Sequence, residues 1–150
     1  MKQKVYVDTA LLVKGYVFET NSREAIAILD ALEVPLLLTH IHEIEVPNAI
    51  RLKRFRGEIT KAEEAASLRL FHADLKAGRL VRPEYKLADV FRRAEKLSAS
   101  HSGEIGTRSM DILHVAAALE IGCTTFASFD ERQRKCAARA GLKIIPEKFS

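Results

Sequence analysis

Three features are missing from this sequence of 150 residues, and each absence excludes a class of protein. No stretch approaches the ~20 consecutive apolar residues of a membrane span. The first residues, MKQKVYVDT, reach an aspartate before an apolar signal segment can form. Its two cysteines, Cys123 and Cys136, have neither the number nor the spacing of a disulfide framework or a zinc site. We therefore expect a cytoplasmic protein with reduced thiols and no membrane partner.

The charge balance is less decisive than these absences. Lysine and arginine number 24 against 20 acidic residues, which gives a net charge of +4 and a pI near 9.2. Such a mild excess favours a polyanionic partner only weakly. The length fits one compact domain over residues 1–150, large enough to fold without disulfide or metal crosslinks.

Short apolar runs alternate with helical patterns along the chain. The runs predict strands over residues 4–8, 34–40, 79–83, 124–130 and 142–146. The helical patterns cover residues 22–33, 42–56, 60–78, 87–101, 109–122 and 131–141. Ser22 is the expected N-cap of the first helix, and Thr60 with Glu63 forms a capping box. Four helices end at a glycine, namely Gly57, Gly78, Gly122 and Gly141. Strands separated by helices predict an α/β fold with a mostly parallel sheet covered on both faces.

Carboxylates stand where these predicted strands end. Asp8 closes the first strand, Glu43 and Glu45 follow the second, and Asp130 closes the fourth. Asp111 lies in the helix that leads into the fourth strand. Ligands of open parallel sheets bind beyond the carboxyl ends of the strands, where clustered carboxylates raise one another's pKa. Mg²⁺ or Mn²⁺ relieves this repulsion and needs few carboxylates, because it keeps several waters. The sequence therefore predicts a metal site at this edge.

A purely structural role is the alternative for two of these acids. Asp111 could interact with the dipole of its helix, and Asp130 could cap the helix that starts at Glu131. Asp8 has no such alternative, because Thr9 leads straight into the next segment and no turn requires an aspartate there.

Four stretches together resemble the PIN-domain family, and within it the VapC-like toxins of toxin–antitoxin pairs. They are VYVDTALLVKGYV, THIHEIEVPNAI, RSMDILHVAAAL and TTFASFDERQRKCAARAGL, and they follow the family's order over nearly the whole chain. The resemblance implies a three-layer α/β/α sandwich and a metal-dependent endoribonuclease that hydrolyses RNA to a 5′-phosphate and a 3′-hydroxyl. It implies Mg²⁺ as cofactor, with Mn²⁺ as a substitute. It also implies a small antitoxin partner and a homodimer.

The same resemblance assigns the site residues. The metal-binding and catalytic acids are Asp8, Glu45, Asp111 and Asp130. Glu45 is preferred to Glu43 because Asn48 follows three residues later, as in the family pattern. Pro47 leaves the choice open, since a proline inside a helix can delay or bend it and so let Glu43 compete.

Polar neighbours of the acids complete the predicted site. Thr9, Asn48 and Ser128 are expected to orient ligands or water, with backbone capping at turns as the alternative. His114 follows Asp111 by one helical turn, and we expect it to be packed and hydrogen-bonded rather than a ligand.

Basic residues near the acids are candidates for contact with the RNA backbone. The run RLKRFRGE supplies Arg51, Lys53, Arg54 and Arg56, and Arg108 lies three residues before Asp111. A solvated helix face is the alternative reading of the run. The antitoxin is expected to place an arginine among the carboxylates, because its guanidinium fork can pair with two of them.

Two other functions stay open at this point. One is a non-catalytic PIN-like module that binds RNA or a protein, although the presence of all four acids argues against it. The other is a metal-dependent phosphatase or DNA nuclease on a similar sheet, which a comparison of substrates would distinguish.

Overall fold

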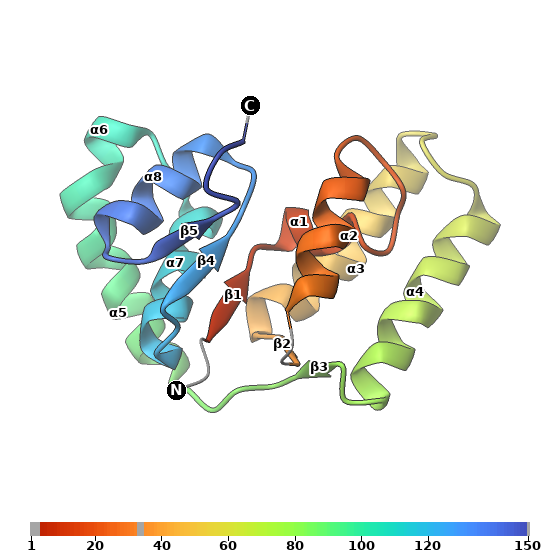
Figure 1. Cartoon of the computed structure of the whole chain (residues 1–150), viewed down its shortest axis with the longest axis horizontal. Helices are drawn as coiled ribbons and strands as arrows, with labels where there is room; N and C mark the ends of the chain where they lie inside the picture. The colour runs from red at the N-terminus through yellow and green to blue at the C-terminus, as the bar shows by residue number, and fades with distance from the viewer. Residues whose placement is uncertain (1–3, 33–34, 150) are drawn as a thin grey trace. The chain divides into compact units, whose positions relative to one another are not determined.

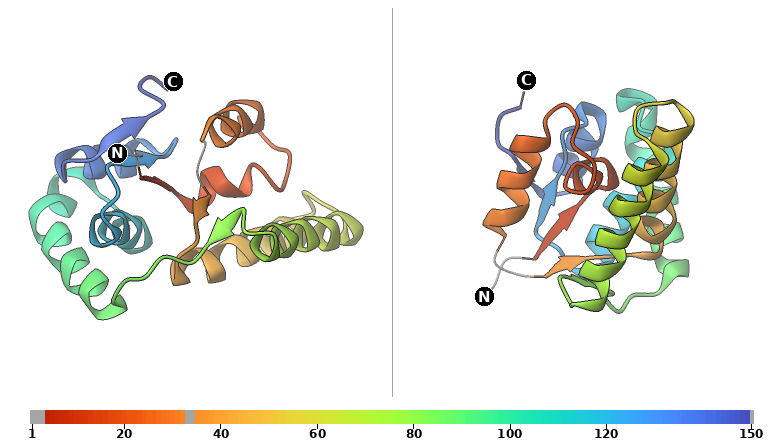
Figure 2. Two further views of the ribbon diagram at one scale, coloured as in Figure 1. Left: turned by 60° about the horizontal axis from the view of Figure 1, so that its bottom comes forward. Right: turned by 90° about the vertical axis from the view of Figure 1, so that its right-hand side faces the viewer.

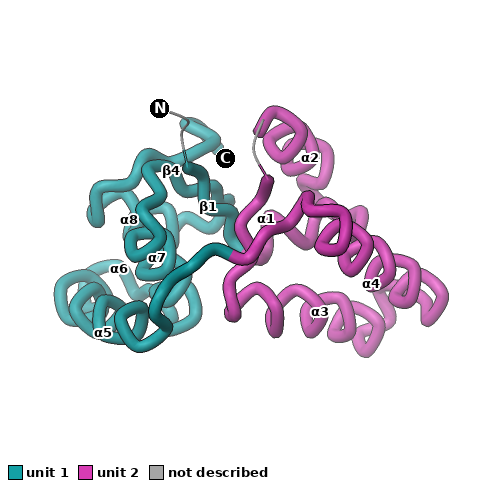
Figure 3. The backbone as a smooth tube through the Cα atoms, turned by 90° about the horizontal axis from the view of Figure 1, so that it is seen from below, with its two compact units in different colours: residues 1–8, 83–150 teal, residues 9–82 magenta. Residues whose placement is uncertain are grey.

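A computed structural model describes residues 4–32 and 35–149 of the chain. It divides the chain into two compact units, residues 1–8 with 83–150 and residues 9–82 (Figure 3). Five strands pair in two ladders, one in each unit, and every pair is parallel. The predicted α/β class with parallel strands is therefore confirmed. Val34, in the predicted second strand, and Glu33, at the end of the first helix, lie outside the described residues.

The first unit is built on a three-stranded sheet. Its strands are β1 (Val5–Val7), β4 (Thr125–Ala127) and β5 (Lys143–Ile145), in the order β1-β4-β5 (Figure 1). Its helices are α5 (Leu87–Leu97), the π-helical turn η1 (Ser98–Ser102), α6 (Gly103–Ile105), α7 (Ser109–Ile121) and α8 (Glu131–Arg139). Helix α7 lies between this sheet and α5 (Figure 2) and also packs against α8. Because it is covered on several sides, it is apolar all round rather than amphipathic.

Aromatic side chains form the centre of this unit. The rings of Tyr6 and Phe126 stack with their centroids 5.4 Å apart. The Tyr6 hydroxyl and His114 Nδ1 share a hydrogen bond of 2.7 Å, and both residues are buried. This agrees with the prediction that His114 is packed and hydrogen-bonded. Cys123 and Cys136 are free, in agreement with the expected reduced thiols. Both are buried, and burial raises the pKa of Cys123 to about 11.

The second unit pairs only two short strands. They are β2 (Leu36–Leu37) and β3 (Leu80–Val81). Its helices are α1 (Thr9–Val13), α2 (Ser22–Ala31), α3 (His40–Phe55) and α4 (Lys61–Lys76). Helix α3 packs against both α1 and α4. None of the helices in residues 4–32 and 35–149 combines the length and apolar character that a bilayer crossing needs.

Helix caps account for most of the agreement and disagreement with the predicted boundaries. Thr60 and Glu63 form the predicted capping box, and all four predicted terminal glycines have positive φ. Ser22 is not an N-cap: its hydroxyl accepts from Glu19 N and donates to Val17 O, and Asn21 occupies the cap position with φ 68°. The predicted helix over residues 87–101 remains α-helical only to Leu97, because the segment SASHS that follows is rich in weak helix formers.

Helix α3 begins two residues earlier than predicted. Thr39 and His42 form a capping box, which starts the helix at His40. Pro47 is buried inside the helix and does not delay it. Of the two ways in which Pro47 could let Glu43 compete with Glu45, a late start or a bend, the late start is therefore excluded.

Replacing Tyr6 with phenylalanine tests the central hydrogen bond. Tyr6→Phe keeps the stacked ring but removes the hydroxyl from a buried ring nitrogen of His114. We expect the free energy of unfolding to fall by about 1–3 kcal/mol in urea denaturation. Tyr16→Phe is the matched comparison, since its partner Asp74 keeps an ion pair with Arg79, and it should cost less. Equal stability of Tyr6→Phe and the wild type would contradict this role.

Candidate active site

Asp8 follows β1 and is buried, with 3% of its surface exposed. Its backbone N–H donates to Ala127 O at 3.0 Å, so it extends the pairing of β1 with β4. Ser128 follows β4, and its hydroxyl donates to Asp8 Oδ2 at 2.6 Å. A buried carboxylate is stable only when polar partners replace water. Ser128, predicted from the sequence to orient a ligand, provides such a partner.

Asp130 lies two residues beyond Ser128, at the start of α8. Its backbone N–H donates to Ser128 Oγ at 3.0 Å, and its Oδ1 accepts from Gln133 N at 2.8 Å. The helix-capping alternative for Asp130 is thus confirmed. The cap employs one of two carboxylate oxygens, so it is compatible with a second role for the same group.

Asp111 lies in the first turn of α7 and shares a cavity with Asp130. The cavity has a volume of about 340 Å³, and Arg108, Glu131 and Arg132 complete its lining. Arg108 Nε donates to Asp111 Oδ2 at 3.2 Å. Burial, followed by the charge of Asp130, raises the pKa of Asp111 despite the opposing effect of Arg108. The unit therefore brings two acids to one cavity and connects Asp130 to Asp8 through Ser128.

The donor chemistry of this cavity fits a hard divalent cation. Asp111 and Asp130 offer carboxylate oxygens. Burial is the main cause of the raised pKa of Asp111 and the charge of Asp130 adds to it, so a cation would stabilise the charged carboxylate. Within the described residues, no group of three or more histidine, cysteine, aspartate or glutamate side chains is arranged to hold a metal ion. Mg²⁺ does not require such a group, because it is commonly bound by one or two carboxylates together with waters and substrate phosphates. The arrangement suits that mode of binding rather than a closed zinc site.

Glu45 belongs to the second unit and lies on α3. Its Oε1 accepts a hydrogen bond of 2.8 Å from the hydroxyl of Thr9, the residue that follows Asp8 in the sequence. Glu43 instead forms an ion pair with Arg82. Asn48 is exposed, three residues after Glu45 on the same helix. The two glutamates therefore have different partners within the second unit, a hydroxyl for Glu45 and an arginine for Glu43.

Two of the four basic residues in the run at the end of α3 are already paired. Lys53 forms ion pairs with Glu19 and, at 3.6 Å, with Glu58, and its side chain is only 13% exposed. Arg54 Nη1 lies 2.9 Å from Glu64 Oε1. The run is therefore neither uniformly solvated nor uniformly available to RNA. Arg51 and Arg56 remain exposed, as does Arg108 of the first unit.

Sequence reasoning missed two residues of this region. Gln133 is buried, its amide Nε2 donates to Asp111 O at 3.3 Å, and its backbone N–H donates to Asp130 Oδ1. Its signal was the D-x-x-Q spacing that begins α8, which is the pattern of a capping box. Arg132 lines the cavity of Asp111 and Asp130, and no sequence signal distinguishes it from the other basic residues of α8.

Comparison with known proteins gives a consistent picture. The family model described as "PIN domain" matches residues 5–139. Among curated proteins there is no match. Several solved structures are similar over most of the chain, among them the following three. FitAcB from Neisseria gonorrhoeae is 18% identical with a TM-score of 0.61, covering 93% of this chain and 95% of that chain. VapC20 from Mycobacterium tuberculosis, a "Sarcin-Ricin loop cleaving toxin", is 14% identical with a TM-score of 0.64, covering 92% and 95%. VapBC2 from Rickettsia felis, bound to a promoter DNA fragment, is 13% identical with a TM-score of 0.63, covering 93% and 96%. At these identities the likeness concerns the fold.

The pairing of Lys53 predicts a role in stability. Burial acts to raise the pKa of Glu19, but hydrogen bonds from Lys53 and Lys14 outweigh it, so that this pKa lies below its ordinary value. A carboxyl with a lowered pKa in the folded state stabilises the fold above its ordinary pKa, and this contribution is lost as the pH falls through the folded value. Lys53→Gln should therefore lower the free energy of unfolding by about 1 kcal/mol at pH 7.

The matched control is Arg51→Gln, which changes an exposed side chain of the same helix. It should leave the free energy of unfolding within about 0.5 kcal/mol of the wild type. In urea denaturation, the difference between Lys53→Gln and the wild type should shrink below the ordinary pKa of glutamate. A difference that is independent of pH, or absent at pH 7, would contradict the ion pair with Glu19.

Proposed function

This chain belongs to the PIN domain family, and we propose that it is a divalent-metal-dependent endoribonuclease, the toxin of a VapBC-type toxin–antitoxin pair. The observation that carries the proposal is the linked group of aspartates in the first unit. Asp8 is bonded to Ser128, Ser128 to Asp130, and Asp130 shares a cavity with Asp111. These three acids lie at the ends of β1 and β4 and at the start of α7. Ligands of parallel sheets bind beyond the carboxyl ends of the strands, so the acids lie where a ligand is expected. PIN nucleases generally use divalent metal ions, which this donor set suits.

We assign the metal and the chemistry to Asp8, Glu45, Asp111 and Asp130. Bound Mg²⁺, or Mn²⁺ in its place, supplies a water of lowered pKa and offsets negative charge on the phosphodiester. Ser128 holds the Asp8 carboxylate, Thr9 holds that of Glu45, and Asn48 is kept as a further polar residue near Glu45.

Exposed arginines are proposed to bind the RNA backbone. Arg108 and Arg132 line the cavity of the two aspartates, so they are suited to bind phosphate oxygens beside the metal. Arg51 and Arg56 of the second unit are exposed and are proposed to attract the RNA backbone electrostatically at longer range. Lys53 and Arg54 are not proposed for this role, because each forms an ion pair with a glutamate.

The proposed partners follow from the resemblance and from the similar structures. The Mycobacterium tuberculosis protein is described as a toxin that cleaves the sarcin–ricin loop, and the Rickettsia felis structure is a VapBC assembly on promoter DNA. For this chain we propose RNA as substrate, a small antitoxin as inhibitor, a homodimer, a cytoplasmic location, and a single PIN-like domain over residues 1–150. An arginine of the antitoxin is expected to pair with the carboxylates.

Replacing Asp111 with asparagine tests the proposed function. The substitution keeps the shape but removes a charge that holds the metal, so RNA cleavage in Mg²⁺ or Mn²⁺ should fall by at least about 100-fold. Because burial disfavours the charged form of Asp111, stability should hold or rise. Asp89→Asn is the matched control, since Asp89 is on the surface of α5 and pairs with Arg92, and it should cleave at the wild-type rate.

Expression in bacteria provides a second readout of the same variants. Wild type and Asp89→Asn should arrest growth, Asp111→Asn should not, and the antitoxin should restore growth. Metal binding without cleavage of any RNA would favour the non-catalytic PIN-like module. Cleavage by Asp111→Asn at the wild-type rate would overturn the proposed site.

A pair of glutamate variants tests the second acid. Glu45→Gln should reduce RNA cleavage by about 10-fold or more, because it replaces a charged metal-binding oxygen donor by a neutral amide. Glu43→Gln removes only an ion pair with Arg82 and should retain activity. The opposite order of rates would transfer the role to Glu43.

A further inference from the structure

The loop that carries Ser128 and Asp130 is held by the end of the chain. Arg134 of α8 donates through Nη1 to Ser128 O at 2.8 Å. Its other terminal nitrogen, Nη2, donates to Pro146 O at 2.7 Å and to Glu147 O at 3.4 Å. One guanidinium therefore joins this loop to the residues that follow β5, which we name the C-terminal segment (residues 146–149).

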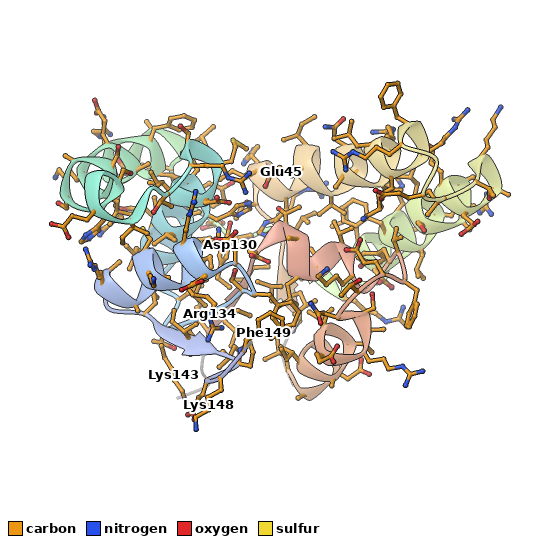
Figure 4. The ribbon with its side chains drawn as sticks, turned by 90° about the horizontal axis from the view of Figure 1, so that it is seen from above. Glu45, Asp130, Arg134, Lys143, Lys148 and Phe149 are labelled. Carbon is orange, nitrogen blue, oxygen red and sulfur yellow. The ribbon has the colours of Figure 1, made fainter. Side chains whose placement is uncertain are left out.

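An aromatic pair makes a second connection between the same two parts. Phe129 stands between Ser128 and Asp130, and its ring stacks on that of Phe149 with centroids 4.2 Å apart and planes 17° apart. Both residues are partly buried. Offset stacking at this distance is favourable and fixes ring orientation. Figure 4 labels Asp130, Arg134 and Phe149 in this unit.

Every residue of the loop is thus held individually. The Ser128 carbonyl is bound by Arg134, the Phe129 ring by Phe149, and the Asp130 backbone by the Ser128 hydroxyl. Ser128 is in turn the residue that donates to Asp8. A metal-binding carboxylate works only within a narrow range of positions, which its neighbours must maintain.

We propose that the C-terminal segment, acting through Arg134 and Phe149, positions Ser128 and Asp130 for metal binding by the aspartates. This inference rests on the proposed function, because it assigns these contacts a role at that site. Arg134 and Phe149 are positioning residues, since their contacts are with the loop that carries Ser128 and Asp130. The contacts lie beyond β5, whose pairing with β4 already places this end of the chain in the sheet. Their loss should therefore alter the loop more than the fold.

The test compares Phe149→Leu, Phe149→Trp and Lys148→Ala. Phe149→Leu keeps an apolar side chain but removes the ring, Phe149→Trp restores a ring, and Lys148→Ala changes an exposed neighbour and leaves the stack intact. Two experiments are made: calorimetry without RNA gives the Kd of Mn²⁺, and RNA cleavage in Mn²⁺ gives kcat and KM. Phe149→Leu should raise the Kd and lower kcat by about 10-fold, with KM unchanged. Phe149→Trp and Lys148→Ala should match the wild type.

A second variant, and measurements on the wild type, distinguish failure of the positioning role from failure of the proposed function. If Phe149→Leu does not fold, Arg134→Lys takes its place, because an ammonium cannot bridge the Ser128 and Pro146 carbonyls as a guanidinium fork does. A folded variant with the wild-type Kd and kcat would overturn the proposal. A wild type that binds Mn²⁺ but cuts no RNA would overturn the proposed function alone, and the Kd values would still decide the positioning role. A wild type that does not bind Mn²⁺ would overturn both.

Discussion

The hydrogen bond from Ser128 to Asp8 is the interaction on which the candidate site depends. A strand that ends on a buried carboxylate is unfavourable unless donors compensate for lost hydration, and the parallel pairing of β1 with β4 brings such a donor to it. The same hydroxyl accepts from Asp130 N, so the end of one strand determines the position of two acids. These two acids and Asp111 are the carboxylates that we propose to bind a cation at this edge, because a cation offsets repulsion between like charges.

The sequence predicted those parts of the fold that depend on contacts between residues close together in the chain. The strand ending at Asp8 and the Thr60–Glu63 capping box depend on neighbours within a few residues, and both are present. The hydrogen bond from Ser128 to Asp8 was not predicted, because it depends on the order and register of β1 and β4, which the sequence pattern does not reveal. Ser22 failed as a cap, since its hydroxyl found partners in the preceding loop and a residue in the left-handed conformation starts the helix instead.

Contacts between distant residues explain what the sequence could not predict. Lys53 and Glu19 are separated by 34 positions, so nothing local distinguishes this lysine from Arg51 in the same basic run. The hydrogen bonds of Arg134 to three backbone carbonyls could not be predicted for a related reason, because backbone acceptors carry no residue-type signal. The partners of the two glutamates are also distant in sequence, since Arg82 pairs with Glu43 and Thr9 donates to Glu45.

The central claim is that the aspartates of the first unit bind a divalent cation. Anomalous scattering from a crystal of the wild-type protein soaked in Mn²⁺ tests it most directly, because the signal locates the ion itself. We predict a peak within coordination distance, about 2.0–2.6 Å, of carboxylate oxygens of Asp111 and Asp130. The peak should disappear in Asp111→Asn. A crystal with these carboxylates accessible and no peak beside them, or a peak at an unrelated site alone, would contradict the account.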